Sequence, residues 1–300
     1  MTLGDNMMNA ATSNIWNLKS TISNLKSIIF VVCVLVAGTA HAQQRPLVTE
    51  DPETIGAGRV LLEGGFSLDS EQSNFVNGLK GDIARLATFG ASIGIGATAE
   101  VQIDGGLYQR LTVTERLPNA PLETITLLLP GDRSSSMEDL IVATKIRLVS
   151  ETPSRPALGL RFGTKLPIAD PEKGMGLGTT DFFASFLVAK TVRSVRTVGN
   201  AGLLMLSNPV TPGDSVSALG YGVSIARAVT NAFELVGEVN GRLTSFEEIV
   251  PGGPDSRAVL RFAGRYTYAM LRLDFGILAG ITNSDPNFGI SAGATYVISR

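Results

Sequence analysis

Cysteine, histidine and tryptophan are nearly missing from this 300-residue chain, which contains one of each. They are Cys33, His41 and Trp16, so the chain from residue 43 onward has no thiol, no imidazole and no disulfide. That part of the chain lacks the histidine on which most serine hydrolases depend, and it lacks the ligands of ordinary zinc sites. Serine–lysine chemistry stays formally open, although no serine pairs convincingly with a lysine. We expect no enzyme activity, no metal and no other cofactor.

An excess of one charge is also missing. The sequence has 25 basic and 27 acidic residues, and without Lys19, Lys26 and Asp5 the part from residue 43 keeps 23 and 26. A net charge near −3 gives no electrostatic basis for binding nucleic acid. Long apolar runs are missing from this part too, although 44% of the whole sequence is hydrophobic and its mean hydropathy is +0.22. A chain this apolar without a transmembrane helix is typical of a lipid-facing β-barrel.

The N-terminal region has the pattern of a secretion signal. Lys19 and Lys26 precede an apolar run at 28–38, which is too short to span a bilayer, and Ala40-His41-Ala42 follows as a small-x-small cleavage site. We predict a signal peptide at 1–42 that is removed on export.

Proline positions divide the rest of the chain into segments. All 14 prolines come after residue 45, and proline cannot donate to a β-ladder. Between them we predict twelve alternating strands that make residues 58–300 one antiparallel transmembrane β-barrel, with short periplasmic turns and longer outer loops. A secreted β-sandwich is the alternative, but it rarely gives so many strands with alternating loop lengths. The predicted strands are 58–68, 82–95, 99–113, 138–150, 157–166, 180–190, 195–206, 217–228, 232–245, 256–267, 270–282 and 288–298.

A period of two along these strands separates a lipid-facing set of side chains from a set that faces the lumen. In the strand 99–113, Val101, Ile103, Leu107, Leu111 and Val113 are expected on lipid, opposite the charged residues. A hairpin through 268–269 is expected to set Arg265 opposite Arg272. The predicted lumen-lining residues are Glu100, Asp104, Arg110, Lys145, Arg147, Arg161, Lys165, Glu234, Glu238, Arg242, Arg257, Arg261, Arg265, Arg272 and Asp274.

These charges have two readings. They can form a constriction that selects small anions or polar solutes. They can equally be interior salt bridges that fill a narrow lumen and hold the barrel rigid. Twelve strands lie between small filled barrels and large open porins, so strand number does not decide.

The last predicted strand, 288–298, resembles the terminal sorting signal of bacterial outer-membrane β-barrels. Ser291, Gly293, Tyr296 and Ile298 have its spacing of polar, glycine, aromatic and hydrophobic residues, although Ser299 and Arg300 follow in place of a terminal phenylalanine. The resemblance implies a bacterial outer-membrane location, with membrane lipid and the barrel-assembly machinery as partners.

A wider resemblance begins at 45–58 (RPLVTEDPETIGAG) and continues through Gly-Thr-Lys165-Leu-Pro, Thr179-Thr-Asp181-Phe-Phe-Ala-Ser and Gly237-Glu-Val-Asn-Gly-Arg242. These stretches resemble a family of bacterial outer-membrane proteins labelled as phenol-degradation (meta-cleavage) pathway components or transporters. The resemblance implies passage of small, aromatic compounds and carries no catalytic motif.

The segment 43–57 is acidic and contains prolines, so we expect a periplasmic tail, a latch on the first strand or a plug inside the lumen. For the whole chain we predict passive passage of small solutes, aromatic or hydrophobic compounds among them, through a narrow charged lumen. Two alternatives stay open. One is a closed structural or adhesive barrel that acts through its outer loops, and the other is a carrier that releases hydrophobic cargo sideways into the membrane.

Overall fold

The computed structural model describes residues 45–74, 76–118, 120–122, 129–244 and 256–298, within one compact unit that runs from residue 42 to the end. The predicted signal peptide, residues 123–128 and the whole connection 246–255 between two of the predicted strands lie outside the described residues. No helix in the described residues is long and apolar enough to cross a membrane.

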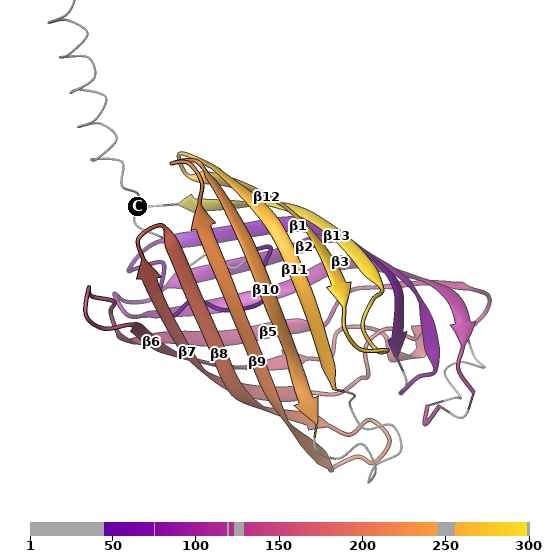
Figure 1. Cartoon of the computed structure of the whole chain (residues 1–300). Helices are drawn as coiled ribbons and strands as arrows, with labels where there is room; N and C mark the ends of the chain where they lie inside the picture. The colour runs from indigo at the N-terminus through magenta and orange to yellow at the C-terminus, as the bar shows by residue number, and fades with distance from the viewer. Residues whose placement is uncertain (1–44, 75, 119, 123–128, 245–255, 299–300) are drawn as a thin grey trace, which may run out of the picture. The chain divides into compact units, whose positions relative to one another are not determined.

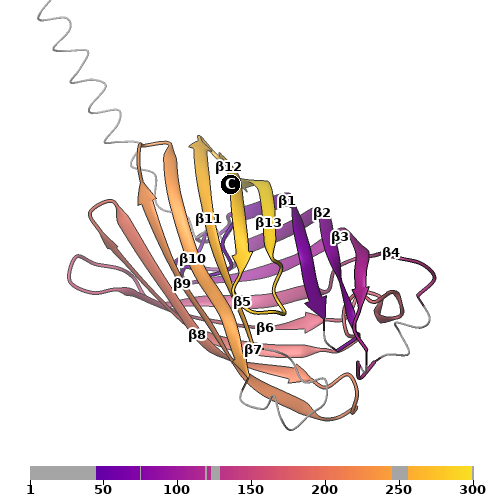
Figure 2. The same cartoon turned by 45° about the vertical axis from the view of Figure 1, so that its right-hand side comes forward.

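Thirteen antiparallel strands form a single sheet that closes on itself (Figures 1 and 2). Closure occurs where β1 pairs with β13, from Val60 opposite Ile298 to Ser70 opposite Phe288. In Figure 1, β8 to β12 form the wall nearest the viewer, and the strands from β1 to β6 run behind it. The strands are β1 (Val60–Asn74), β2 (Leu79–Gly94), β3 (Ala99–Arg116), β4 (Arg133–Ser136), β5 (Leu140–Val149), β6 (Ala157–Leu166), β7 (Asp181–Val192), β8 (Val195–Ser207), β9 (Ser215–Ala228), β10 (Phe233–Thr244), β11 (Arg257–Tyr268), β12 (Leu271–Gly280) and β13 (Phe288–Ile298).

The prediction of an all-β barrel with twelve strands is confirmed, with the short strand β4 as an addition. β4 continues the line of β5 beyond a break at residues 137–139 and pairs with β3. The predicted loop 69–81 is wrong, because β1 and β2 run on to Asn74 and Leu79 and leave only four residues between them. We call the end of the barrel where β1 begins and β13 ends the turn end, and the opposite end the loop end.

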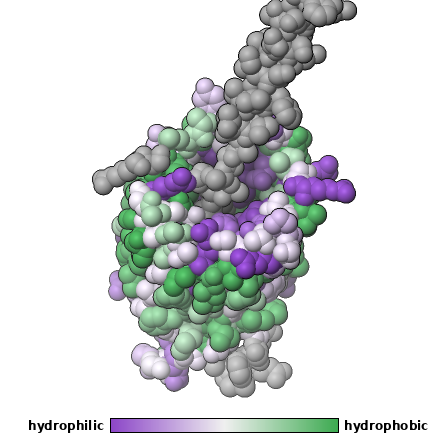
Figure 3. All heavy atoms as spheres, turned by 90° about the vertical axis from the view of Figure 1, so that its left-hand side faces the viewer, coloured by the Kyte–Doolittle hydropathy of each residue, from purple (hydrophilic) through white to green (hydrophobic). Residues whose placement is uncertain are grey.

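Side chains alternate between an apolar outer face and a polar inner face, as in β12. Leu271, Leu273 and Phe275 are exposed, whereas Arg272 and Asp274 between them are buried. Figure 3 views the barrel from the side where the turn end lies, with hydrophilic side chains near the middle and hydrophobic ones on the flanks. An apolar belt around a polar interior is the pattern expected of a barrel in lipid.

The alternation changes phase in β2 and β3, which corrects one prediction. Ala87 has a φ of 55° and forms a bulge against β1, so the inward residues of β2 are odd-numbered before it and even-numbered after it. The same change of inward positions occurs in β3, because Gln109 of β3 pairs with the inward Arg85 of β2. Leu111 and Val113 are therefore buried on the inner side rather than facing lipid, and Arg110 is exposed on the outer side.

The connection from β6 to β7, residues 167–180, folds over the inner face at the loop end. It contains a 3₁₀ turn at Pro171–Lys173, which Asp170 caps and which ends at Gly174 with a φ of 71°, a conformation that favours glycine. Met175 follows and is buried against Leu79, Leu111, Val113 and Leu129. The phase change in β2 and β3 creates the apolar surface that holds this connection in place.

Candidate functional site: the barrel lumen

Residues 45–57, which we call the inner segment, lie inside the barrel. Of the three predicted placements, the contacts match the one in which the segment enters the lumen. Leu47, Glu50 and Ile55 are buried, and their partners are inward side chains of the strands. The segment has no regular secondary structure and depends on the wall for its hydrogen bonds.

The inner segment follows the wall around the barrel in strand order. The Ile55 amide donates to Glu100 of β3 at 2.7 Å, and Glu53 pairs with Arg147 of β5. Asp51 then accepts from Arg196 of β8 at 2.7 Å. Leu47 packs among Ala226, Val236 and Ala263, which belong to β9, β10 and β11. The segment thus forms a belt on the inner wall of the turn-side half of the lumen.

The most deeply buried part of this belt is an ion-pair cluster. Lys145 Nζ lies 3.0 Å from Glu100 and 3.3 Å from Glu50, and its side chain is 1% exposed. Arg161 lies 3.0 Å from Glu50 and 3.5 Å from Asp104. Charges removed from water to this degree are stable only when each has partners, so the cluster fixes Glu50 and with it the path of the segment.

Glu238 holds the next stretch of the belt. Its carboxylate accepts from the amides of Val48 and Thr49 at 2.8 and 2.7 Å, and from Arg261 at 3.0 Å. It is 2% exposed. Across β10 and β11, Glu238 stands directly opposite Arg261 and Glu234 directly opposite Arg265.

Arg45 occupies a slot at the closing seam of the barrel. Its guanidinium donates to the Ala292 carbonyl of β13 and to Thr88 of β2, both at 3.0 Å, and its Nε lies 3.6 Å from Asp274 of β12. The slot exists because Gly65 and Gly293 face each other across β1 and β13, and a Cβ on either would stand within 2.5 Å of the guanidinium.

The predicted pairing of Arg265 with Arg272 is wrong. The turn between β11 and β12 is Ala269–Met270, one residue later than predicted, so Arg265 stands opposite Asp274 and Arg272 opposite Thr267. Arg265 and Arg272 both donate to the Arg45 carbonyl, at 3.1 and 3.3 Å. These two arginines therefore hold the inner segment and contribute little to the open part of the lumen.

The residues of the resembled sorting signal divide between the two faces of β13. Tyr296 and Ile298 are exposed on the outer face, as such a signal requires, and Ser291 and Gly293 face the lumen. Gly293 thus has a second, structural reason to be glycine, since it makes room for Arg45.

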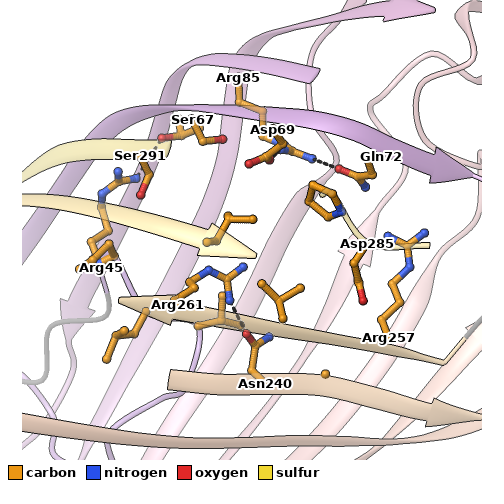
Figure 4. Close-up of a pocket in the computed structure, with 18 of the residues that line it drawn as sticks. Arg45, Ser67, Asp69, Gln72, Arg85, Asn240, Arg257, Arg261, Asp285 and Ser291 are labelled. Atoms are coloured by element: carbon orange, nitrogen blue, oxygen red, sulfur yellow. Dashed lines mark hydrogen bonds and ion pairs between the residues drawn. The ribbon is translucent and has the colours of Figure 1, made fainter. Parts of the chain in front are cut away.

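A cavity of about 550 Å³, which we call the chamber, lies on the loop side of the inner segment. Five arginines and two aspartates line it: Arg45, Arg85, Arg242, Arg257, Arg261, Asp69 and Asp285. Figure 4 shows Arg85 beside Asp69 and Gln72 on one side, and Arg261 with Asn240 on the other. Leu47, Leu204 and Leu278 add apolar surface to the same cavity. The chamber is therefore amphipathic, with a positive excess in its lining.

A smaller cavity of about 210 Å³, the vestibule, lies toward the loop end. Its lining includes Leu177 from the connection 167–180 and Leu206 from β8. Gln72, Arg242 and Arg257 line both cavities, so they mark where the vestibule meets the chamber. Arg242 and Arg257 stand directly opposite each other on β10 and β11.

The remaining predicted lumen residues also have defined places. Lys165 lies 2.9 Å from Asp181 and 3.2 Å from Asp139, at the loop end. Arg110 is the one predicted residue that the phase change moves to the outer face. Sequence reasoning missed Arg45, Arg85 and Arg196 as lumen residues. The acids of the inner segment indicated basic partners for it, whereas nothing in the sequence marks the bulge that turns Arg85 inward.

The described residues contain no group of three or more histidine, cysteine or acidic side chains placed to hold a metal ion. The lumen chemistry is thus that of guanidinium, ammonium and carboxylate groups beside leucines. Such a set can bind or exclude small charged solutes.

Searches among family models and among curated proteins find no match. Among solved structures, an outer membrane channel from Pseudomonas putida F1 aligns over 83% of this chain and 98% of its own, with a TM-score of 0.56 and 12% identity. The NanC porin (TM-score 0.48, 7% identity) covers 79% of this chain and 98% of its own. The toluene transporter TodX of Pseudomonas putida (0.39, 10%) covers 82% and 91%. At 12% identity, the likeness to the channel from Pseudomonas putida F1 establishes the fold alone, which is that of an outer-membrane β-barrel.

Proposed function

We propose that the chain is an outer-membrane channel for the passive passage of small solutes. The observation that carries the proposal is a pair of adjoining cavities, which share three lining residues inside a barrel with an apolar outer face. The fold shared with an outer membrane channel supports it by analogy. The resemblance to the phenol-degradation family adds small aromatic compounds as a candidate cargo.

In the proposed path a solute enters the vestibule, passes Arg242 and Arg257 and reaches the chamber. The positive excess in the chamber lining favours anions over cations, because charged rings in a narrow lumen select by sign. The inner segment narrows the path beyond the chamber and makes passage slow and selective for size.

Single-channel conductance of the refolded chain 43–300 in planar bilayers tests this proposal. We expect discrete, salt-dependent steps whose reversal potential in a salt gradient shows a preference for anions. Arg257→Gln should reduce that preference, while Arg110→Gln on the outer face should leave it unchanged and serves as the matched control. A heat-modifiable, β-rich protein that never conducts would contradict the channel.

A folded protein that does not conduct would favour a closed structural barrel, and one observation supports that alternative. The inner segment forms ion pairs or hydrogen bonds with β3, β5, β6, β8 and β10 to β13, enough to hold the turn-side half shut. Release of hydrophobic cargo sideways into the membrane requires a break between strands, and all neighbouring strands in the described residues are paired.

A further inference from the structure

We infer that Arg242 and Arg257, together with Leu204 and Leu206 of β8, form a binding site for small amphipathic monocarboxylates: one carboxylate on a compact apolar body. The inference deepens the proposed channel and rests on it for the site's place along a solute path. Binding itself can be measured without conduction.

The arginine pair is the first part of the site. The two residues stand directly opposite each other and both face inward, so their guanidinium groups lie on the same face of the sheet. A carboxylate placed there can accept hydrogen bonds from both. The planar guanidinium also matches a carboxylate through two parallel hydrogen bonds.

Position selects this pair among the lumen arginines. Arg242 and Arg257 are the two arginines that line both the chamber and the vestibule. Arg45, Arg85 and Arg261 line the chamber alone. An anion that moves from one cavity to the other therefore passes the arginine pair.

The apolar part of the site comes from a different strand. Leu204 and Leu206 are consecutive inward residues of β8, and the first lines the chamber while the second lines the vestibule. Leu177 and Pro209 extend the apolar surface in the vestibule, and Leu47 and Leu278 extend it in the chamber. On either side of the arginine pair, a bound carboxylate finds leucines within the same cavity.

Size and charge narrow the ligand class further. The chamber, at about 550 Å³, falls within the range of small-ligand pockets, and the vestibule is smaller at about 210 Å³. A single ring or a short branched chain fits this space. Asp181 lines the vestibule, and Asp69 and Asp285 line the chamber, so a second carboxylate on the ligand would meet negative charge in either direction.

Equilibrium dialysis of labelled benzoate against the mature protein, purified in detergent from outer membranes, tests the site. We expect saturable binding of benzoate. Acetate and benzyl alcohol should each compete at least about tenfold less well than unlabelled benzoate, because acetate lacks the ring and benzyl alcohol lacks the carboxylate. Arg242→Gln and Arg257→Gln should each weaken binding about tenfold. Arg257→Lys should weaken it as well, since it keeps the charge but loses the fork.

Two controls keep the test decisive. Arg110→Gln should bind benzoate as the unaltered protein does, and every variant is first checked for heat-modifiable migration in gels, which shows a folded barrel. Equal competition by acetate or benzyl alcohol, tighter binding of inorganic phosphate, or unchanged affinity in both arginine variants would overturn the inference. Benzoate binding by a protein that never conducts would keep the site and remove the channel. Anion conduction without benzoate binding would do the reverse.

Discussion

The two halves of the lumen contain the same types of charged residue, but these residues have different roles in each half. In the turn-side half, Lys145, Glu100 and Glu238 are fully buried and bound to the inner segment. In the loop-side half, arginines outnumber aspartates around an open cavity. Inward charge alone therefore does not indicate a solute path. What distinguishes the halves is whether the inner segment fills the space between the charged side chains.

Removing residues 43–57 should have the largest effect, because it abolishes the difference between a filled turn-side half and an open loop-side half. The deletion removes Glu50 from Lys145 and Asp51 from Arg196 and empties the turn-side half, and each buried pair broken costs roughly 3–5 kcal/mol. We expect a much lower unfolding midpoint in urea and a single-channel conductance that rises severalfold. A deletion that leaves both the midpoint and the conductance unchanged would show that the inner segment neither supports nor narrows the barrel.

Removing a single carboxylate that binds the inner segment should also destabilise the barrel, but by less. Glu238→Ala leaves two backbone amides without their acceptor and Arg261 without its carboxylate partner, and we expect a loss of about 3 kcal/mol in the free energy of unfolding. Glu234→Ala, four residues away, removes one ion pair whose carboxylate is 33% exposed, and should cost about 1 kcal/mol or less. Equal losses in urea titrations of the two variants would mean that Glu238 has no special role.

The slot for Arg45 can be filled without touching a charge. In Gly65→Ala the new Cβ would stand 2.4 Å from the Ala292 carbonyl and 2.3 Å from the guanidinium, so Arg45 must leave. We expect a loss of about 1–3 kcal/mol. Gly64→Ala is the matched control, because its Cβ would point outward with its nearest neighbour, the Thr88 carbonyl, at 3.7 Å. A Gly65→Ala barrel as stable as Gly64→Ala would show that Arg45 does not staple the seam.

The smallest expected effect is a pH dependence at the turn 150–156. Partial burial acts to raise the pKa of Glu151, but hydrogen bonds from the Thr191 amide and from Arg196 hold that pKa below its usual value of 4.5. A pKa lowered by folding adds stability above pH 4.5, and that stability is lost as the pH falls through the lowered pKa. For a pair this exposed we expect less than about 1 kcal/mol.

Unfolding midpoints measured from pH 6 to pH 3 check this for Glu151→Gln. The variant should be less stable than the unaltered chain at pH 6, and the two curves should converge as the pH falls. A difference that stays constant over this range would assign the effect to something other than the charge on Glu151.

How far the structure could be predicted depended on which residues carry a periodic signal. Prolines and two-residue alternation indicated the twelve main strands and most of the lumen charges, because sterics and lipid enforce both patterns. The bulge at Ala87 and the position of the turn at Ala269 could not be predicted from the sequence. Both alanines have φ values above 50°, a conformation that glycine or asparagine usually marks. The predicted lipid-facing positions of Leu111 and Val113 in β3 and the predicted pairing of Arg265 were wrong for that reason.

The belt could be foreseen only as one option among three. Its acidic residues suggested basic partners, yet an irregular segment has no period from which a path can be read. The cavities could not be predicted from the sequence, because their size and position depend on how the connection 167–180 and the inner segment divide the lumen.

The belt also separates two properties that strand number normally ties together. In a plain barrel, the bore and the perimeter exposed to lipid both follow from the count of strands. Here thirteen residues form an inner lining that can be lengthened, shortened or recharged without changing any side chain that meets the membrane. Variation within 45–57 is therefore a route by which one barrel wall could serve many different bores.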